Sequence, residues 1–169
     1  MKNIVLVGFM ATGKTSVGKI LAKKLSCPVI DVDHCIEEKE KRKISDIFAK
    51  DGEPFFRKLE KDTIREIAQG QGVIITTGGG AVMDPENMEA LRKTGWIVAL
   101  FAKPETIFQR ARSSHHRPLL KVEDMLAEIN RLLTIRKPFY EKSDFQFDTD
   151  GRSAGQVAQL ILETLEGKL

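Results

Sequence analysis

Eight residues near the amino terminus, Gly8 to Thr15, read Gly-Phe-Met-Ala-Thr-Gly-Lys-Thr and fit the pattern G-x-x-x-x-G-K-[ST]. The two glycines let the backbone curl with its N–H groups turned toward phosphate oxygens, and the helix that follows presents its N-terminus to the anion. In such a loop Lys14 reaches the β and γ phosphates and the Thr15 hydroxyl ligates Mg²⁺. A chance match in a chain of this length has a probability below about 1%. The motif predicts a nucleotide phosphate site, with a ligand-free glycine loop as the alternative, and its expected contacts are Ala11, Thr12, Gly13, Lys14, Thr15 and Ser16.

The class of nucleotide enzyme follows from what accompanies this loop. The chain has no Asn-Lys-x-Asp segment to recognise guanine, which argues against a GTPase. At 169 residues it is short for an ABC-type or helicase motor, and it lacks a long apolar strand that ends in paired acids. A kinase that acts on a small molecule fits this size.

Two aspartates, Asp31 and Asp33, directly follow the second apolar run. They are two residues apart, so both would face the same side of an extended chain. Beside a magnesium nucleotide, one carboxylate can hold the metal through water while the other orients or deprotonates an acceptor hydroxyl. The alternative is that Asp33 caps the helical stretch behind it, and the phosphate loop favours the functional interpretation.

Three further features are ambiguous when taken singly. Arg57 could form a surface pair with Glu53 at i,i+4. The run Gly78–Gly80 permits close approach of a ligand and positive φ, or simply a tight strand-to-helix turn. Arg136, near a helix end, could complement the helix dipole. In the predicted fold all of them belong to the same end of the sheet as the aspartates.

A polar segment, Ser113–Lys121, contains Arg117 and is predicted to be a mobile loop. Phosphoryl transfer needs cationic charge on the transition state and exclusion of water, and a closing loop with an arginine supplies both. The alternative is a solvated basic turn. Arg110 and Arg112, at the end of the preceding helix, either assist at the phosphates or satisfy that helix end.

The elements that position these residues alternate along the chain. Short runs rich in Val, Ile or Phe predict strands, buried on both faces, at Asn3–Val7, Val29–Val32, Val73–Thr77, Ile97–Ala102 and Phe145–Asp148. Helical spacing predicts helices at Lys14–Leu25, Pro54–Ala68, Pro85–Lys93, Pro104–Arg112, Glu123–Lys137 and Ala154–Leu165. In Pro54–Ala68 the expected buried face holds Phe55, Leu59, Ile64 and Ile67, and Pro138 is expected to stop the helix before it.

This alternation predicts a three-layer α/β/α sandwich around a five-stranded parallel sheet. Ligands of such sheets bind outside the carboxyl ends of the strands. The polar segment Asp33–Gly52 interrupts the alternation and is expected to contain one short helix at Ser45–Lys50.

Composition narrows the class of protein. A length of 169 residues suggests one domain at about 150 residues per domain. The formal net charge of +3 is too small for a dedicated nucleic-acid module, and no apolar run approaches the roughly 20 residues of a bilayer helix. Cys27 and Cys35 form neither a disulfide framework nor a zinc motif, so we expect a cytoplasmic protein that binds neither nucleic acid nor membrane.

Taken in order, these motifs resemble the shikimate kinase family. The matching features are Gly8–Thr15, Asp31-Val32-Asp33, Asp46-Ile47-Phe48, Gly52-Glu53 to Phe56-Arg57, Gly78 to Val82, Arg117 to Leu120, and Arg136 ahead of Pro138 and Tyr140. The resemblance implies an adenylate-kinase-like P-loop fold in a single kinase domain over residues 1–169. It also implies a substrate-binding segment at about 33–61 and a lid at about 112–123.

The family transfers the γ-phosphoryl group of ATP to the 3-hydroxyl of shikimate, in aromatic amino-acid synthesis, with Mg²⁺. For the nucleotide, the resemblance implies that Lys14 grips the phosphates, Thr15 ligates Mg²⁺ and Asp31 holds the metal through water. It places Arg117 on ATP as the lid cation, with Arg152 as the candidate that stacks on adenine and Arg110 as a further nucleotide contact.

For the acceptor, the resemblance implies that Asp33 binds the hydroxyl and acts as the base. Arg57 and Arg136 clamp the shikimate carboxylate, and Gly78, Gly79 and Gly80 line the site, Gly79 through its backbone. Planar guanidinium groups suit a carboxylate better than lysine does. We expect the partners to be shikimate and ATP alone, with the chain a monomer. The rival hypotheses are a kinase for another polyol acid such as gluconate, and a nucleotide-binding regulatory or scaffold protein without turnover.

Overall fold

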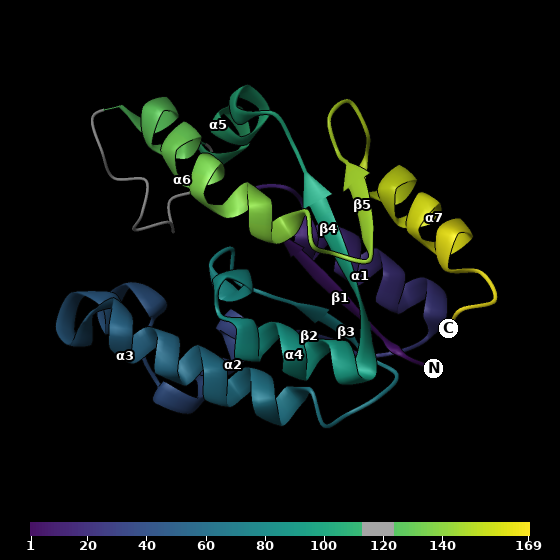
Figure 1. The fold of residues 1–169 in the computed structure, drawn as a ribbon, viewed down its shortest axis with the longest axis horizontal. Helices are drawn as coiled ribbons and strands as arrows, with labels where there is room; N and C mark the ends of the chain where they lie inside the picture. Colours follow the sequence, from purple (N-terminus) through teal and green to yellow (C-terminus); the bar gives the residue numbers. More distant parts are fainter. Residues whose placement is uncertain (113–123) are drawn as a thin grey trace.

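The computed structural model describes residues 1–112 and 124–169. A five-stranded, all-parallel sheet runs through its middle in the order β2-β3-β1-β4-β5 (Figure 1). The strands are β1 (Asn3–Gly8), β2 (Val29–Asp31), β3 (Ile74–Thr76), β4 (Gly95–Phe101) and β5 (Phe145–Asp148). The predicted five-stranded parallel sheet is therefore confirmed.

Alternating side chains of the central strand β1 divide the core into two layers. Ile4 and Leu6 pack with α1 (Lys14–Leu25) and α7 (Ala154–Leu165) on one face. Val5 and Val7 lie in the larger core on the other face. That core is covered by α2 (Val32–Glu40), α3 (Ile44–Ile67), α4 (Pro85–Thr94), α5 (Pro104–Arg112), α6 (Met125–Tyr140) and the short 3₁₀ helix η1 (Ala81–Met83). The predicted three-layer sandwich follows from this alternation, because successive strand residues point to opposite faces.

The segment after β2 differs from the prediction. Val32 begins α2 rather than ending a strand, and α2 occupies the first part of the polar segment, up to Glu40. Its fully buried side chains are Val32 and Ile36, spaced by four, and its polar residues lie mainly toward solvent, except that one oxygen of Asp33 is buried. The two helices predicted from Ser45 and from Pro54 form one element, α3, with a kink at Gly52, where φ is 83°.

The buried face of α3 also differs from the predicted one. Leu59 and Ile67 pack against the core as expected, but Phe55 is exposed, and the fully buried apolar side chains after the kink are Phe56 and Ile64. The site carboxylate Glu60 lies between them on the buried face.

Two other boundaries were wrong for local reasons. Pro138 does not stop α6, which continues to Tyr140, because proline removes only one backbone donor and the last turn is anchored by the buried Tyr140 ring. The helix starts at Met125, and the Asp124 side chain accepts the Ala127 N–H as its cap. Strands β2 and β5 are partly exposed because they form the two edges of the sheet.

The chain ends lie at the amino-terminal end of the strands, opposite the expected ligand edge. The Lys2 ammonium lies 4.1 Å from the centre of the Trp96 ring, and the Trp96 indole N–H donates to the Lys168 carbonyl at 3.1 Å. Trp96, near the start of β4, therefore packs at the amino-terminal end of the sheet, away from the candidate site.

Candidate active site

The loop Gly8–Thr15 joins the carboxyl end of β1 to α1 in left-handed backbone geometry. Gly8 has φ 142°, and a Cβ there would lie 2.4 Å from the Leu100 carbonyl oxygen, so only glycine fits. Gly13, at the start of α1, has φ 98°, and Ala11 has φ 60°, an uncommon value for a residue with a side chain. Positive φ at these three separate positions curls the loop, as the sequence motif requires for an anion cradle.

Side chains of the same loop brace it internally. The Lys14 Nζ donates to the carbonyl oxygens of Gly8 at 2.7 Å and Phe9 at 2.8 Å. The buried Thr12 hydroxyl donates to the Phe9 carbonyl at 2.8 Å. Thr15 and Ser16 are exposed in the first turn of α1, so the residues predicted for the nucleotide lie on one continuous loop and helix start.

Asp31 ends β2 and caps the helix that follows. Its Oδ1 accepts the His34 N–H at 3.1 Å, and its Oδ2 accepts the Thr76 hydroxyl of the neighbouring strand at 2.7 Å. The capping residue is thus Asp31 and not Asp33. Asp33 lies in the first turn of α2, so the expectation that both carboxylates face the same side of an extended chain was wrong.

Asp33 is a carboxylate in a confined site. Its Oδ1 is buried and has no hydrogen-bond partner among the described residues. Burial raises its pKa to about 6, helped by the negative charges of Asp31 and Glu60 and opposed by Lys14 and Arg57. A carboxyl group with this pKa can exchange a proton near neutral pH, which is the property required of a general base.

The three glycines after β3 leave room for charged side chains. A Cβ on Gly78 would lie 3.0 Å from Asp33 Oδ1 and 3.1 Å from Glu60 Oε1. On Gly79 it would lie 3.3 Å from an Arg136 nitrogen, and on Gly80 it would lie 2.4 Å from Arg57 Nη2. None of the three has a positive φ, so glycine is needed here because charged side chains approach the backbone closely, and not because the chain makes a left-handed turn. We call Gly78–Gly80 the glycine turn.

Arg57 is held by two carboxylates of its own helix. Its Nη1 donates to Glu60 Oε2 at 2.7 Å, and its Nη2 donates to Glu53 Oε1 at 3.0 Å. The predicted surface pair with Glu53 exists, but the same guanidinium also reaches the buried Glu60. Burial acts to lower the pKa of Arg57, but the charges and hydrogen bonds of Glu60 and Glu53 together raise it by more, so the group stays cationic.

Arg136 lies inside the protein rather than at an exposed helix end. Arg136 is only 5% exposed, and its guanidinium lies 5.7 Å from the centre of the Phe9 ring in the phosphate loop. Its Nε is buried and has no hydrogen-bond partner within the described part of the chain. Tyr140, four residues later on the same helix face, donates its hydroxyl to the Gly79 carbonyl at 2.5 Å.

The remaining arginines lie on the nucleotide side. Arg110 Nη1 donates to the Ala11 carbonyl at 3.1 Å, and its Nη2 donates to the Thr149 carbonyl at 3.2 Å, so Arg110 connects the phosphate loop to the segment after β5. Arg152 is exposed and donates to the Asp148 carbonyl at 2.8 Å. Arg117 and the predicted lid at 112–123, apart from Arg112, lie outside the described residues.

Sequence reasoning missed Glu60 and Tyr140. Glu60 is 1% exposed and is spaced by four from both Phe56 and Ile64, so its place on an apolar stripe was the available signal. Tyr140 is also 1% exposed and is spaced by four from Arg136, and the expected helix end at Pro138 hid that spacing. Both residues support the arginines at the glycine turn.

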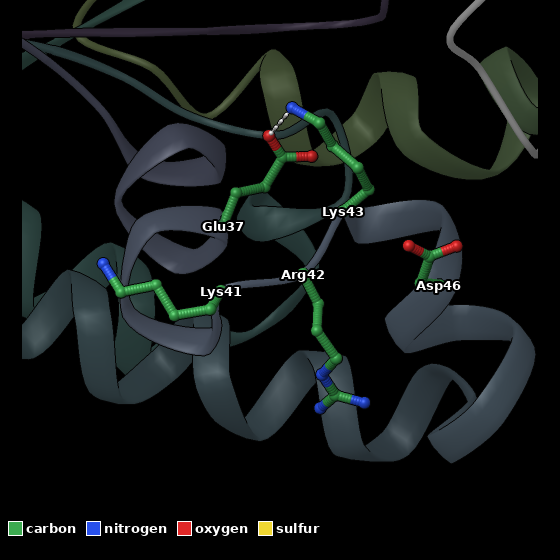
Figure 2. Close-up of a pocket in the computed structure, with 5 residues that line it drawn as sticks. All are labelled: Glu37, Lys41, Arg42, Lys43 and Asp46. Atoms are coloured by element: carbon green, nitrogen blue, oxygen red, sulfur yellow. Dashed lines mark hydrogen bonds and ion pairs between the residues drawn. The ribbon is translucent and has the colours of Figure 1, made fainter.

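A separate pocket at the turn between α2 and α3 contains none of the predicted site residues. Figure 2 shows its lining side chains, Glu37, Lys41, Arg42, Lys43 and Asp46. Glu37 Oε1 accepts the Ile44 N–H at 3.0 Å, and its Oε2 pairs with Lys43 Nζ at 2.9 Å. Glu37 therefore caps the start of α3, the helix that carries Arg57.

Residues 1–112 and 124–169 lack two features that would point to other kinds of site. No cluster of three or more His, Cys, Asp or Glu side chains there could hold a metal by itself. No helix in these ranges is long and apolar enough to cross a membrane.

Known proteins are similar to this chain in sequence and fold. The family model described as "Shikimate kinase" matches residues 10–166. A shikimate kinase from Thermodesulfovibrio yellowstonii is 48% identical over 98% of this chain and 96% of its own length, and one from Caldicellulosiruptor saccharolyticus is 46% identical over 96% and 94%. The crystal structure of a shikimate kinase from Acinetobacter baumannii in complex with shikimate has a TM-score of 0.95 and 37% identity, covering 99% of this chain and 94% of that one.

These matches span nearly the whole chain, and the structures they include have the P-loop NTPase fold. The enzymes of this family are ATP-dependent kinases that transfer phosphate to an alcohol group. Together with the phosphate loop, the buried aspartate and the paired arginines at one sheet edge, they establish that this chain belongs to the shikimate kinase family.

Proposed function

We propose that this chain transfers the γ-phosphoryl group of ATP to the 3-hydroxyl of shikimate, producing 3-phosphoshikimate and ADP, as a step of aromatic amino-acid synthesis. One observation carries the proposal: the glycine turn brings Asp33, Arg57 and Arg136 to the sheet edge where the phosphate loop begins. The complex of the Acinetobacter baumannii relative with shikimate supports this choice of acceptor.

The nucleotide side is assigned to the phosphate loop. Backbone N–H groups of Ala11 to Gly13 receive the phosphates, and Lys14 neutralises their charge. The residues at this edge fit Mg²⁺, because an exposed Thr15 hydroxyl and the Asp31 carboxylate are oxygen donors, and Mg²⁺ takes few protein ligands beside substrate phosphates. Thr15 would ligate the ion directly and Asp31 through water. When bound, it would neutralise charge on the β and γ phosphates.

The acceptor side is assigned to the glycine turn and its arginines. Two planar guanidinium groups, Arg57 and Arg136, suit a carboxylate because each offers parallel N–H donors. Asp33 holds the acceptor hydroxyl and takes its proton as the phosphoryl group moves. Its raised pKa fits that exchange. Positioning and charge neutralisation then supply most of the rate enhancement.

The same proposal covers the organisation of the whole chain. Residues 1–169 act as a single kinase domain and as a monomer in the cytoplasm, with a substrate-binding segment at about 33–61. The lid at about 112–123 brings Arg117 to the transferring phosphate. Arg110 and Arg152 border the nucleotide, and Arg152 does so at adenine. The position of Arg110 in α5 beside the phosphate loop and that of Arg152 after β5 support this.

The experiment that tests the proposal is an ADP-release assay with magnesium ATP and a panel of acceptors. The panel contains shikimate, quinate, gluconate, AMP and buffer alone. Turnover with shikimate alone is the expected result. Turnover with gluconate would retain the phosphate site and reject the acceptor assignment. Nucleotide binding without turnover on any acceptor would favour a regulatory protein.

A further inference from the structure

The Tyr140 hydroxyl is a buried polar group at the site for which the proposed function has no use. Tyr140 is the single tyrosine of the chain and is 1% exposed. Its ring packs edge-on against Phe101, with ring centres 6.3 Å apart. Its hydroxyl leaves this apolar contact to donate to the Gly79 carbonyl at 2.5 Å. A buried hydroxyl costs free energy unless it is paired, so this bond fixes the direction of the side chain.

The acceptor of this bond belongs to the peptide unit that joins Gly79 and Gly80. The chain contains no cis peptide bond in its described part, and in a trans unit the carbonyl and the N–H point in opposite directions. Holding the Gly79 oxygen therefore also sets the direction of the Gly80 N–H. Among the described residues that N–H has no acceptor, although Gly80 is buried against Arg57.

Glycine on both sides makes this peptide unit easy to rotate unless something holds it. Glycine accepts a wide range of φ and ψ, so the turn itself does not impose one orientation. The Tyr140 hydroxyl is the side-chain donor that the described structure provides for that carbonyl. Arg136 approaches the same glycine from one helical turn earlier, and its cationic charge faces the Tyr140 hydroxyl.

We propose that Tyr140 is a positioning residue for the carboxylate of the acceptor. It holds the Gly79–Gly80 peptide so that the Gly80 N–H and the Arg136 guanidinium meet the same carboxylate oxygens. The inference rests on the proposed function, because it needs a carboxylate acceptor at the glycine turn. It predicts a defect in acceptor binding and none in nucleotide binding.

The test is the variant Tyr140→Phe, which removes one oxygen and keeps the ring. Loss of one hydrogen bond that orders a binding group is expected to raise KM for shikimate about tenfold. The KM for ATP and kcat are expected to stay within about twofold of wild type, because the phosphate site keeps all its contacts. Phe139→Leu is the matched control at the same helix end, since Phe139 contacts the Lys142 ammonium and not the glycine turn.

A second measurement distinguishes a role of Tyr140 in positioning the peptide from a role in packing the core alone. The KM or inhibition constant of the neutral methyl ester of shikimate is expected to be the same for wild type and Tyr140→Phe, because the ester lacks the anion that the peptide orients. A merely structural role would change shikimate and its ester equally, or would raise KM for ATP as well. Either result would overturn the inference.

A third measurement uses wild-type protein, so it does not depend on whether the variant folds. Wild-type protein labelled with fluorotyrosine carries one fluorine, at position 140. Its fluorine NMR signal is expected to shift when shikimate is added and to stay in place when ADP is added; a signal insensitive to shikimate would refute the role. If wild type lacks shikimate turnover altogether, the proposed function fails, and that outcome is distinct from normal turnover with an unchanged Tyr140→Phe.

Discussion

Ionisable side chains that are buried in this protein gather at one point, around the glycine turn. Glu60 and Arg136 are almost fully buried there, and Asp33 has a buried oxygen. Burying charge is costly, and each of these groups retains a polar atom without a partner in the described structure. Such atoms are expected where a polar ligand completes the site, which is the basis for assigning the acceptor to this place.

Asp33→Asn is expected to stabilise the protein above pH 6. The pKa of Asp33 is raised from 3.8 to about 6, mainly by burial. Between these values the folded state keeps a proton that the unfolded state has lost, so the free energy of unfolding falls as pH rises. At 1.36 kcal/mol for each pKa unit, the loss approaches about 3 kcal/mol.

Urea unfolding measures this effect on wild type and variant. The difference in stability is expected to be small at about pH 4 and to grow in favour of Asp33→Asn toward about pH 7.5. Asp62→Asn, on an exposed position of α3, is the control and is expected to show no such trend. A constant difference at both pH values would argue against a raised pKa.

Arg136→Lys is expected to weaken acceptor binding although it keeps the charge. Lysine lacks the planar fork that meets both oxygens of a carboxylate, so KM for shikimate is expected to rise about tenfold while KM for ATP changes little. Steady-state kinetics in both substrates measure the split. Lys137→Arg, the exposed neighbour, is the control. Equal increases in both KM values would contradict the carboxylate clamp.

At the scale of elements, the site depends on how closely α3 and α6 approach the glycine turn. Gly80→Ala is expected to displace Arg57, because the new Cβ would lie 2.4 Å from its Nη2 and within 3 Å of two other guanidinium atoms. Loss of one clamp contact is expected to raise KM for shikimate about tenfold or more. The measurement is shikimate KM at saturating ATP.

Gly155→Ala is the matched control for that substitution. Gly155 lies in α7, and the atom nearest to its Cβ would be the Ser153 hydroxyl at 3.8 Å. Alanine there is expected to stabilise the helix by about 0.5–1 kcal/mol without changing KM. If Gly80→Ala also left KM unchanged, Arg57 would not be held where the structure places it.

The sequence predicted the elements whose signals are local and missed those that depend on packing. The loop Gly8–Thr15 and helix α1 were predicted to the residue, because the motif and the spacing of Val17 and Leu21 are strong. Helix α2 was missed because only Val32 and Ile36 are buried in it. Glu60 was missed because nothing in the sequence shows why a charged residue would be buried on an apolar stripe. The reason is its ion pair with Arg57, which only the structure shows.

For the whole molecule, the parallel sheet explains why two ligands meet. All five strands end at the same edge, so the phosphate loop after β1 and the glycine turn after β3 are neighbours although about 70 residues separate them. Arg136 contacts both, lying over Phe9 of the loop and against Gly79 of the turn. The two ligand sites are thus parts of one surface with separate sets of residues.

This separation predicts independent effects on thermal stability. Shikimate and magnesium ADP, each at about 100 times its Kd, are each expected to stabilise the protein by about 2.7 kcal/mol and to raise Tm by about 5–10 °C. Lys14→Met is expected to lose the nucleotide shift and keep the shikimate shift, and Lys19→Met, exposed on the same helix, to keep both. Loss of both shifts in Lys14→Met would mean that the sites are not separate.

The most direct test of the account is phosphorus NMR of the product made from magnesium ATP and shikimate by the purified chain. The account predicts one new phosphate monoester whose phosphorus correlates with the proton on carbon 3 of shikimate. It also predicts that Asp33→Asn makes this product far more slowly. Inorganic phosphate alone, or a phosphate on another hydroxyl, would contradict the assignment of Asp33 and the arginine clamp.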